Sequence, residues 1–128
     1  MVDWMTGGEA VQAMRPYETQ LRIALENADD GQTIEDVRLQ LMDQTAQLWV
    51  GPWAAVVTKV VDGRVVLWLC GGKMEGLDRL LPDIERFARG LGCKGLMVYG
   101  RPGWERTFLR AAGFRQTWSI MVKDYEQG

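Results

Sequence analysis

The fold is decided by residues 64–99, RVVLWLCGGKMEGLDRLLPDIERFARGLGCKGLMVY. An apolar, β-branched run over Arg64–Cys70 predicts a strand, which two glycines end. From about Leu77 to Leu91 the apolar side chains recur at helical spacing, and Leu96–Tyr99 is a second short apolar strand. A strand, a helix and a strand in this order form a right-handed crossover, so we predict two parallel strands in one sheet.

Pro82 lies inside the predicted helix. An interior proline removes one backbone hydrogen bond and clashes with the preceding turn. We therefore expect either that the main helix begins at Pro82, after a short first turn, or that the helix kinks there. Gly90, Gly92 and Gly95 supply its end.

Three antiparallel strands are predicted up to Cys70. Between Ala46 and Val50 the hydrophobic period is two, which indicates a short strand. Ala54–Val61 is a β-branched run, and Asp62-Gly63 joins it to the strand that begins at Arg64. Asp-Gly is a strong signal of a two-residue hairpin turn, because glycine adopts positive φ. The two longer strands are apolar on both faces, so we expect both faces of the sheet to be covered.

The N-terminal third predicts two helices. Pro16 suits the first turn of the first helix. Its apolar face is made by Tyr17, Leu21, Ala24, Leu25 and Ala28. Thr33 begins the second helix, with Asp36 in a capping-box position. Residues 1–14 contain two adjacent glycines and no clear period, so we expect an irregular lead-in.

The last quarter of the chain predicts one more helix and one more strand. Gly100–Gly103 opens the helix, and Gly113 ends it. A strand follows over about Arg115–Val122, and residues 124–128 form a polar tail.

The predicted order is helix, helix, three strands, helix, strand, helix, strand. We expect residues 1–128 to form a single domain, the usual outcome for a chain of this length. Its class is α/β (α+β), with a mixed, mostly antiparallel sheet and helices on both faces.

The composition limits the chemistry. Hydrophobic residues make up 47% of the 128 and charged residues 25%, which is ordinary for a globular domain. There is no histidine, so His-based triads, His metal sites and His general bases are excluded. The two cysteines, Cys70 and Cys93, form no CxxC pair, so we expect a reduced protein without a metal site.

Charge and hydropathy bear on partners and location. Fifteen basic against seventeen acidic residues give no general attraction to nucleic acid. Met1–Trp4 lacks the basic and apolar segments of a signal peptide, and the longest apolar run, Val65–Cys70, is far shorter than the ~20 residues of a membrane span. We expect a soluble, cytoplasmic protein that binds neither membranes nor nucleic acid.

The element order is similar to that of the GNAT fold, the fold of the Gcn5-related N-acetyltransferases. Ala111–Phe114 (AAGF) before a strand resembles the "GF" that ends the fourth helix of many members. Gln47–Val50 followed by Ala54–Thr58 is similar to the central hairpin of small phage and prophage GNAT-like proteins, and so is Gly100–Arg106. The likeness covers about residues 15–123.

The resemblance implies a binding site for acetyl-CoA. In this family the two parallel strands splay apart at their C-terminal ends, and the pantetheine arm lies between them as an added strand would. The pyrophosphate binds N–H groups at the start of the next helix, which is Gly71–Gly76 here. The implied cofactor-binding residues are Leu69, Cys70, Gly71, Gly72, Lys73, Gly76, Arg101 and Arg106. Arg101 and Arg106, with Arg110, would hold the 3′-phosphate or another anion, or else form a solvated helix face.

The mechanism implied by the resemblance is direct attack of a neutral amine on the thioester, with backbone N–H groups near Cys70 polarising the carbonyl. The family's frequent tyrosine acid falls on Leu109 here. Tyr99 is therefore the candidate acid for the departing thiolate, and Glu75 the candidate base for the amine. The plainer alternatives are a sheet-edge tyrosine, a solvated carboxylate and, for Cys70, a small buried side chain.

Six tryptophans are many for this length. Trp68 and Trp118 lie in predicted strands and are expected in the core. The others lie at ends or turns, where they either line a pocket or interface or cover the edges of a small core: Trp4, Trp49, Trp53 and Trp104.

The predicted turn departs from the family's phosphate-loop signature. Aligned on Gly76, the chain has Gly71 where Arg or Gln is usual and Met74 where the middle glycine is usual. The glycines also suit a plain strand-to-helix turn. Two hypotheses stay open: an acetyl-CoA-dependent N-acyltransferase with an unknown amine acceptor, or a catalytically degenerate GNAT-like phage accessory or assembly protein. The second would act through protein–protein contacts, with a phage partner or as a homo-oligomer.

Overall fold

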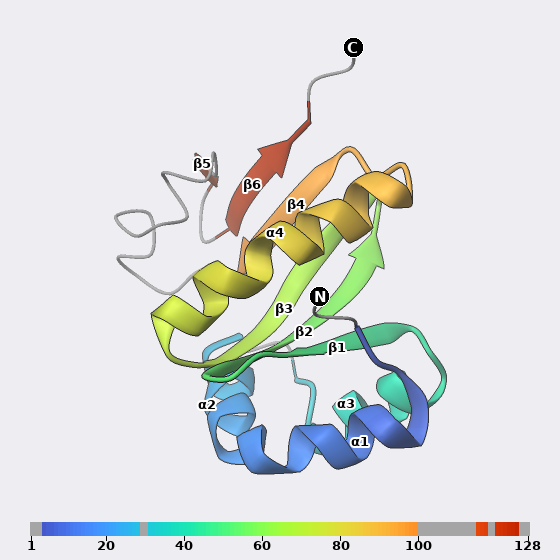
Figure 1. Ribbon diagram of the computed structural model, residues 1–128, viewed down its shortest axis with the longest axis vertical. Coiled ribbons are helices and arrows are strands. Elements are labelled where there is room, and N and C mark those ends of the chain that lie inside the picture. The colour runs from blue at the N-terminus through green and yellow to red at the C-terminus, as the bar shows by residue number, and fades with distance from the viewer. Residues whose placement is uncertain (1–3, 29–30, 100–114, 118–119, 126–128) are drawn as a thin grey trace.

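The computed structural model describes residues 4–28, 31–99, 115–117 and 120–125 (Figure 1). The helices are α1 (Gly7–Met14), α2 (Glu18–Ala28), α3 (Ile34–Met42) and α4 (Met74–Gly90), with a 3₁₀ turn at Arg15–Tyr17. The strands are β1 (Ala46–Val50), β2 (Ala54–Val61), β3 (Arg64–Gly72), β4 (Gly95–Tyr99), β5 (Arg115–Thr117) and β6 (Ile120–Asp124).

The strands form one six-stranded sheet in the order β1-β2-β3-β4-β6-β5. Among the described pairs only β3 and β4 run parallel, and α4 connects them. Helix α4 covers one face of the sheet, and α1, α2 and α3 gather on the other (Figure 1). The predicted mixed, mostly antiparallel sheet with helices on both faces is confirmed.

The boundaries of the strand and the helix in the β3–α4–β4 crossover differ from those predicted. Strand β3 continues through both glycines to Gly72, and α4 begins at Met74 rather than near Leu77. Pro82 lies inside α4, so the helix does not begin there. An interior proline costs about 3 kcal/mol. Each buried leucine or isoleucine offsets about 1.5–3 kcal/mol of that, and α4 buries Leu77, Leu80, Leu81 and Ile84.

The N-terminal segment is more ordered than its sequence predicts. The expectation of an irregular lead-in over residues 1–14 is wrong for Gly7–Met14, which is α1. Ala10 and Met14 of this helix are fully buried. Ahead of it, Met5 exchanges two backbone hydrogen bonds with Leu48, of 2.8 and 2.9 Å, on the outer edge of β1. Tertiary burial thus stabilises a helix that two glycines make weak by themselves.

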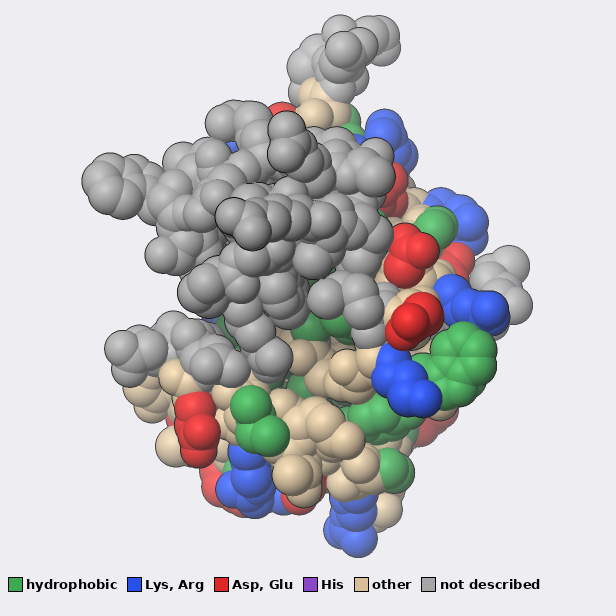
Figure 2. Space-filling model, turned by 90° about the vertical axis from the view of Figure 1, so that its left-hand side faces the viewer, with side chains coloured by type: hydrophobic (Ala, Val, Ile, Leu, Met, Phe, Trp, Pro, Cys, Tyr) green, Lys and Arg blue, Asp and Glu red, His purple; other side chains and the backbone are tan. Residues whose placement is uncertain are grey.

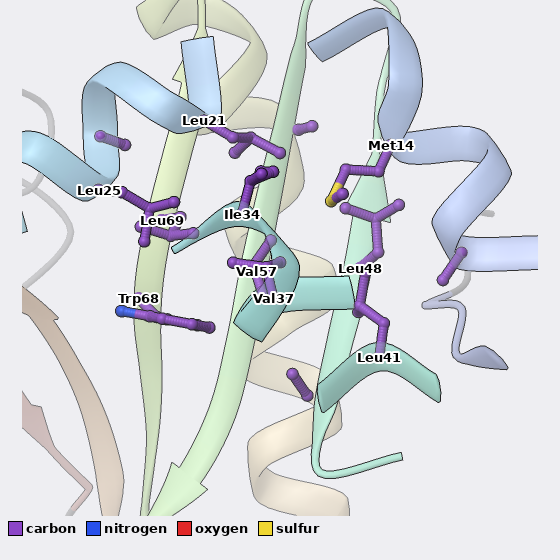
Figure 3. Close-up of a cluster of buried hydrophobic side chains, with 14 of the residues drawn as sticks. Met14, Leu21, Leu25, Ile34, Val37, Leu41, Leu48, Val57, Trp68 and Leu69 are labelled. Atoms are coloured by element: carbon purple, nitrogen blue, oxygen red, sulfur yellow. The ribbon is translucent and has the colours of Figure 1, made fainter. Parts of the chain in front are cut away.

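Both faces of the sheet carry a hydrophobic core. On one face, side chains of α1–α3 meet those of β1, β2 and β3 (Figure 3). The residues labelled there are Met14, Leu21, Leu25, Ile34, Val37, Leu41, Leu48, Val57, Trp68 and Leu69. On the other face, α4 packs on Trp49, Val56, Val65, Leu67, Leu96 and Val98. A buried polar group adjoins this second core: Thr58 donates a 2.9 Å hydrogen bond to Gln47 and accepts one of 3.0 Å from Trp49.

Two local sequence signals are confirmed. Asp62 and Gly63 have φ angles of 51° and 77°, as a two-residue hairpin turn between β2 and β3 requires. Thr33 caps α3: its Oγ1 accepts from the Asp36 N–H, and the Asp36 carboxylate accepts from the Thr33 N–H at 2.8 Å.

The C-terminal part is more elaborate than expected. In place of one strand over Arg115–Val122 there are two, β5 and β6, paired antiparallel. Residue 124 does not begin a polar tail, because Asp124 ends β6 and forms a 2.7 Å ion pair with Arg64. The predicted last helix and residues 126–128 lie outside the described residues. In the described part of the chain no helix is long and apolar enough to cross a membrane.

Tyr125 closes the core at the far end of α4. Its ring lies under the Arg89 guanidinium at 3.9 Å, and its N–H donates to the Lys94 carbonyl. Beside it, Lys123 pairs with Glu85 at 2.5 Å. The Tyr125 hydroxyl is buried and has no hydrogen-bond partner among the described residues. Burial, helped by the Glu85 charge, raises the pKa of Tyr125 to about 12.

Replacing Thr33 by alanine should remove the cap of α3. We expect Thr33→Ala to lower the free energy of unfolding by about 1 kcal/mol, measured by urea denaturation. Thr6, the N-cap of α1, makes no side-chain capping hydrogen bond, so Thr6→Ala is the matched control and should change little. Equal losses in both variants would contradict the role of the Thr33–Asp36 pair.

Tyr125 should make stability fall at high pH. A phenol whose pKa is raised on folding favours the folded state below the unfolded pKa, about 10, and this contribution disappears as pH rises through about 12. Tyr125→Phe should flatten the fall in melting temperature above pH 10. At neutral pH the variant should be as stable as the wild type or more so, because it removes a buried, unpartnered hydroxyl. A variant that keeps the wild-type alkaline slope would disprove this assignment.

Candidate functional site: the end of β3 and the start of α4

Strand β3 carries a bulge that the sequence pattern does not predict. Val57 pairs with Leu69 and Thr58 with Leu67, which leaves Trp68 as the extra residue. As a result Trp68 and Leu69 both face the α1–α3 core, although neighbours in a regular strand face opposite sides. A bulge bends its strand and increases the local twist.

Parallel pairing ends where the bulge begins. The register between β3 and β4 runs from Arg64 and Gly95 to Leu67 and Val98. Beyond this point β3 continues in register with β2 as far as Gly72. Strand β4 ends one residue later, at Tyr99, so β3 extends beyond its parallel neighbour in the described part of the chain.

The turn from β3 into α4 is bound to the start of β2. The Lys73 N–H donates to the Trp53 carbonyl at 2.9 Å, and the Gly76 N–H donates to the Lys73 carbonyl at 3.0 Å. Lys73 is the N-cap of α4, and its side chain makes no capping hydrogen bond. The positive end of the helix dipole therefore lies at this turn without a side-chain acceptor from its cap residue.

The glycines of this turn are needed for close packing. A Cβ on Gly72, whose φ is 109°, would lie 2.2 Å from the Trp53 carbonyl oxygen. A Cβ on Gly76 would lie 2.7 Å from the Cβ of Ala54, and one on Gly71 would lie 2.8 Å from the Cβ of Gln20 in α2. The missing side chains of these three glycines thus leave room for protein atoms.

Seven predicted site residues lie in one chain segment, the end of β3 and the start of α4: Leu69, Cys70, Gly71, Gly72, Lys73, Glu75 and Gly76. Leu69 is fully buried, and Cys70 is half-buried beside the α4 core. Lys73 and Glu75 are exposed in the turn and the first turn of α4. The backbone of Tyr99 ends β4. Its side chain lies outside the described residues, as do Arg101, Arg106 and Arg110.

Two neighbours of this segment were missed by the sequence analysis. Gln20 packs on Gly71, and Arg79 of α4 stacks on Trp53, its guanidinium carbon 4.7 Å from the ring centroid. The Gly51-Pro52-Trp53 turn signals a reversal of the chain, but no local pattern shows which residues of α2 and α4 will contact it.

The arrangement of helices and strands is similar to that of several solved structures. The chain aligns over 98% of its length with 99% of the PaiA N-acetyltransferase from Thermoplasma acidophilum in complex with coenzyme A, at a TM-score of 0.66 and 12% identity. It aligns over 99% with 90% of a GNAT family acetyltransferase from Brucella melitensis in complex with acetyl-CoA, at 0.62 and 12%. It aligns over its whole length with 96% of the ribosomal-protein-S18-alanine N-acetyltransferase from Escherichia coli, at 0.66 and 13%.

The chain has the GNAT fold. By sequence, it matches no protein-family model and no curated protein. At 12–13% identity the likeness to the solved structures is one of fold, so the backbone and not the side chains carries it. In this fold, β3 and β4 are the parallel pair, and α4 is the helix that connects them.

Alanine in place of Gly76 should disturb the contact between α4 and β2. We expect Gly76→Ala to lower the free energy of unfolding by about 1–3 kcal/mol, because the new methyl group overlaps Ala54. A methyl group added at Gly90, in the same helix, would meet no atom within 4 Å. Gly90→Ala is therefore the matched control and should be neutral or stabilising. Thermal unfolding of both variants tests this, and equal stabilities would contradict the packing role of Gly76.

Proposed function

We propose that the protein transfers an acyl group from acyl-CoA, most simply acetyl-CoA, to an amine. The nitrogen of the neutral amine attacks the thioester carbonyl carbon, the new C–N bond forms, and the C–S bond breaks. The amine loses one proton, and the departing thiolate gains one. The protein's part is to hold the two substrates together, polarise the carbonyl and supply the proton.

One observation carries this proposal: the parallel register ends at Leu67 and Val98, and the N-terminus of α4 follows directly on the strand that continues. A strand edge can pair with the amides of a pantetheine arm. A helix N-terminus favours a pyrophosphate. Two of the solved structures with this fold are complexes with coenzyme A or acetyl-CoA, which supports the choice of acyl-CoA as the substrate.

The chain's own residues fit these tasks in part. Backbone groups near Leu69 and Cys70 would face the pantetheine arm and polarise the thioester carbonyl. Gly71, Gly72 and Gly76 keep the turn flat against β2 and α2. The exposed Lys73 would add positive charge beside the pyrophosphate.

Further residues complete the proposed site. Glu75, exposed in the first turn of α4, would accept the amine proton. Tyr99 would protonate the thiolate. Arg101 and Arg106 would bind the 3′-phosphate. The amine acceptor stays unassigned.

The packing of the glycines supports a second candidate function. All three glycines contact protein atoms closely, so a plain structural turn explains them as well as a phosphate loop does. The chain would then keep the GNAT fold without catalysis. It would act through protein contacts, as a homo-oligomer or as an accessory or assembly protein of a phage, in the host cytoplasm or the virion. Binding of acetyl-CoA separates the two candidates.

We expect the wild-type protein to bind acetyl-CoA in isothermal titration calorimetry and to release free thiol when an amine acceptor is found in a panel of polyamines and peptides. Tyr99→Phe should lower kcat by roughly a hundredfold, the usual contribution of a general acid, and leave the affinity for acetyl-CoA unchanged. Tyr125→Phe, at the opposite end of α4, is the control and should keep its activity. Absence of heat and of thermal stabilisation at millimolar acetyl-CoA would refute the transferase and leave the second candidate.

A further inference from the structure

We propose that Trp53 and Arg79 form a platform on which the adenine ring of the CoA nucleotide stacks. The platform deepens the acyl-CoA proposal and rests on it, since it assigns residues to the nucleotide end of the same substrate. Neither residue was implied by the resemblance or by the turn sequence.

The first observation is an aromatic ring kept at the surface. Trp53 is 43% exposed, although the protein buries Trp49 and Trp68 almost completely. Arg79 places its guanidinium carbon 4.7 Å from the Trp53 ring centroid. An arginine stacked on one side of an indole holds it in place by a cation–π interaction, while the exposed surface of the ring can take a planar ligand.

The second observation is that the backbone beneath this ring is fixed. The Gly51 N–H donates to the Ala54 carbonyl at 2.9 Å and closes the turn. The Tyr17 hydroxyl donates to the Gly51 carbonyl at 3.1 Å, and the Lys73 N–H donates to the Trp53 carbonyl. The backbone of this turn is therefore held by three elements: the 3₁₀ turn before α2, strand β2 and the start of α4. A ring presented on a fixed backbone loses little conformational entropy when a base stacks on it.

The third observation is position. The Trp53 carbonyl binds the residue directly before α4, and Arg79 lies in the second turn of that helix. The platform therefore borders the helix N-terminus where the pyrophosphate is proposed to bind. In coenzyme A the adenosine is attached to this pyrophosphate, so a nucleotide held at the first turn of α4 has its base within reach of Trp53.

Charge alone does not account for nucleotide binding here. The exposed charges at the start of α4 are two cations, Lys73 and Arg79, and two carboxylates, Glu75 and Asp78, so they cancel. On the face shown in Figure 2, the described basic and acidic side chains are likewise interspersed rather than gathered by sign. Stacking on an indole does not depend on net charge and contributes substantially for each base. The indole is thus the group that distinguishes a nucleotide from any other anion.

The test compares two ligands that differ in the nucleotide: coenzyme A and 4′-phosphopantetheine. Trp53→Ala should lower the affinity for coenzyme A by roughly tenfold in calorimetry, and should leave the affinity for 4′-phosphopantetheine unchanged. Trp53→Phe should recover part of the loss, and Arg79→Gln should weaken coenzyme A binding in the same selective way. Trp4, 44% exposed and packed on Phe87, supplies the matched control, because Trp4→Ala should bind both ligands as the wild type does.

Coenzyme A should also quench the fluorescence of the wild-type protein, and most of this quenching should be absent in Trp53→Phe. The platform is refuted, with the acyl-CoA proposal intact, if the wild type binds the two ligands equally well. It is refuted in the same way if Trp53→Ala weakens both ligands alike, since that indicates a structural role. A wild-type protein that binds neither ligand refutes the acyl-CoA proposal together with the platform.

Discussion

The rest of the structure depends on strand β3, which is buried on both faces. Its parallel neighbour, β4, pairs with only the first part of it. Hydrophobic side chains of β3 alternate between the α1–α3 core and the α4 core, and the bulge at Trp68 interrupts this alternation. Burial on both faces specifies the register of this strand, because a shift by one residue would expose a whole buried row. The part of β3 that extends beyond its pairing with β4 is thus held by β2 and by the two cores.

A second consequence of this packing is the close contact between the start of β2 and the start of α4. Backbone approaches backbone there, with Gly72 and Gly76 against Trp53 and Ala54. The contact leaves no room for side chains between the two elements, so glycine is required at these positions whether or not a phosphate binds. This explains how a chain can depart from the family's loop signature and still keep the family's backbone. The glycines of this turn therefore do not by themselves indicate catalysis.

Local signals in the sequence predict most of the fold. Asp62-Gly63 and the Thr33–Asp36 box act over a few residues and are found where expected, and the strand–helix–strand period needs no distant partner. The failures all depend on tertiary contacts. Helix α1 forms over Gly7-Gly8 because Met14 is buried, and α4 runs through Pro82 because its other side packs on the sheet. The bulge at Trp68 contains no turn-forming residue such as glycine, so nothing in the sequence VVLWLC indicates it. For the same reason the sequence indicated the turn of the candidate site but not Gln20 or Arg79, which reach it from other elements.

The ion pair between Arg64 and Asp124 joins residues that are 60 positions apart, and β6 lies between β4 and β5 in the sheet although it is made last. During synthesis the N-terminal part of the chain leaves the ribosome first. One edge of β4 therefore stays unpaired until β6 has been synthesised. An unpaired strand edge is a template for association with other chains. A chain that lacks β6 would therefore leave this edge of β4 unpaired and would be prone to aggregation, so the pairing of β6 protects the sheet against association.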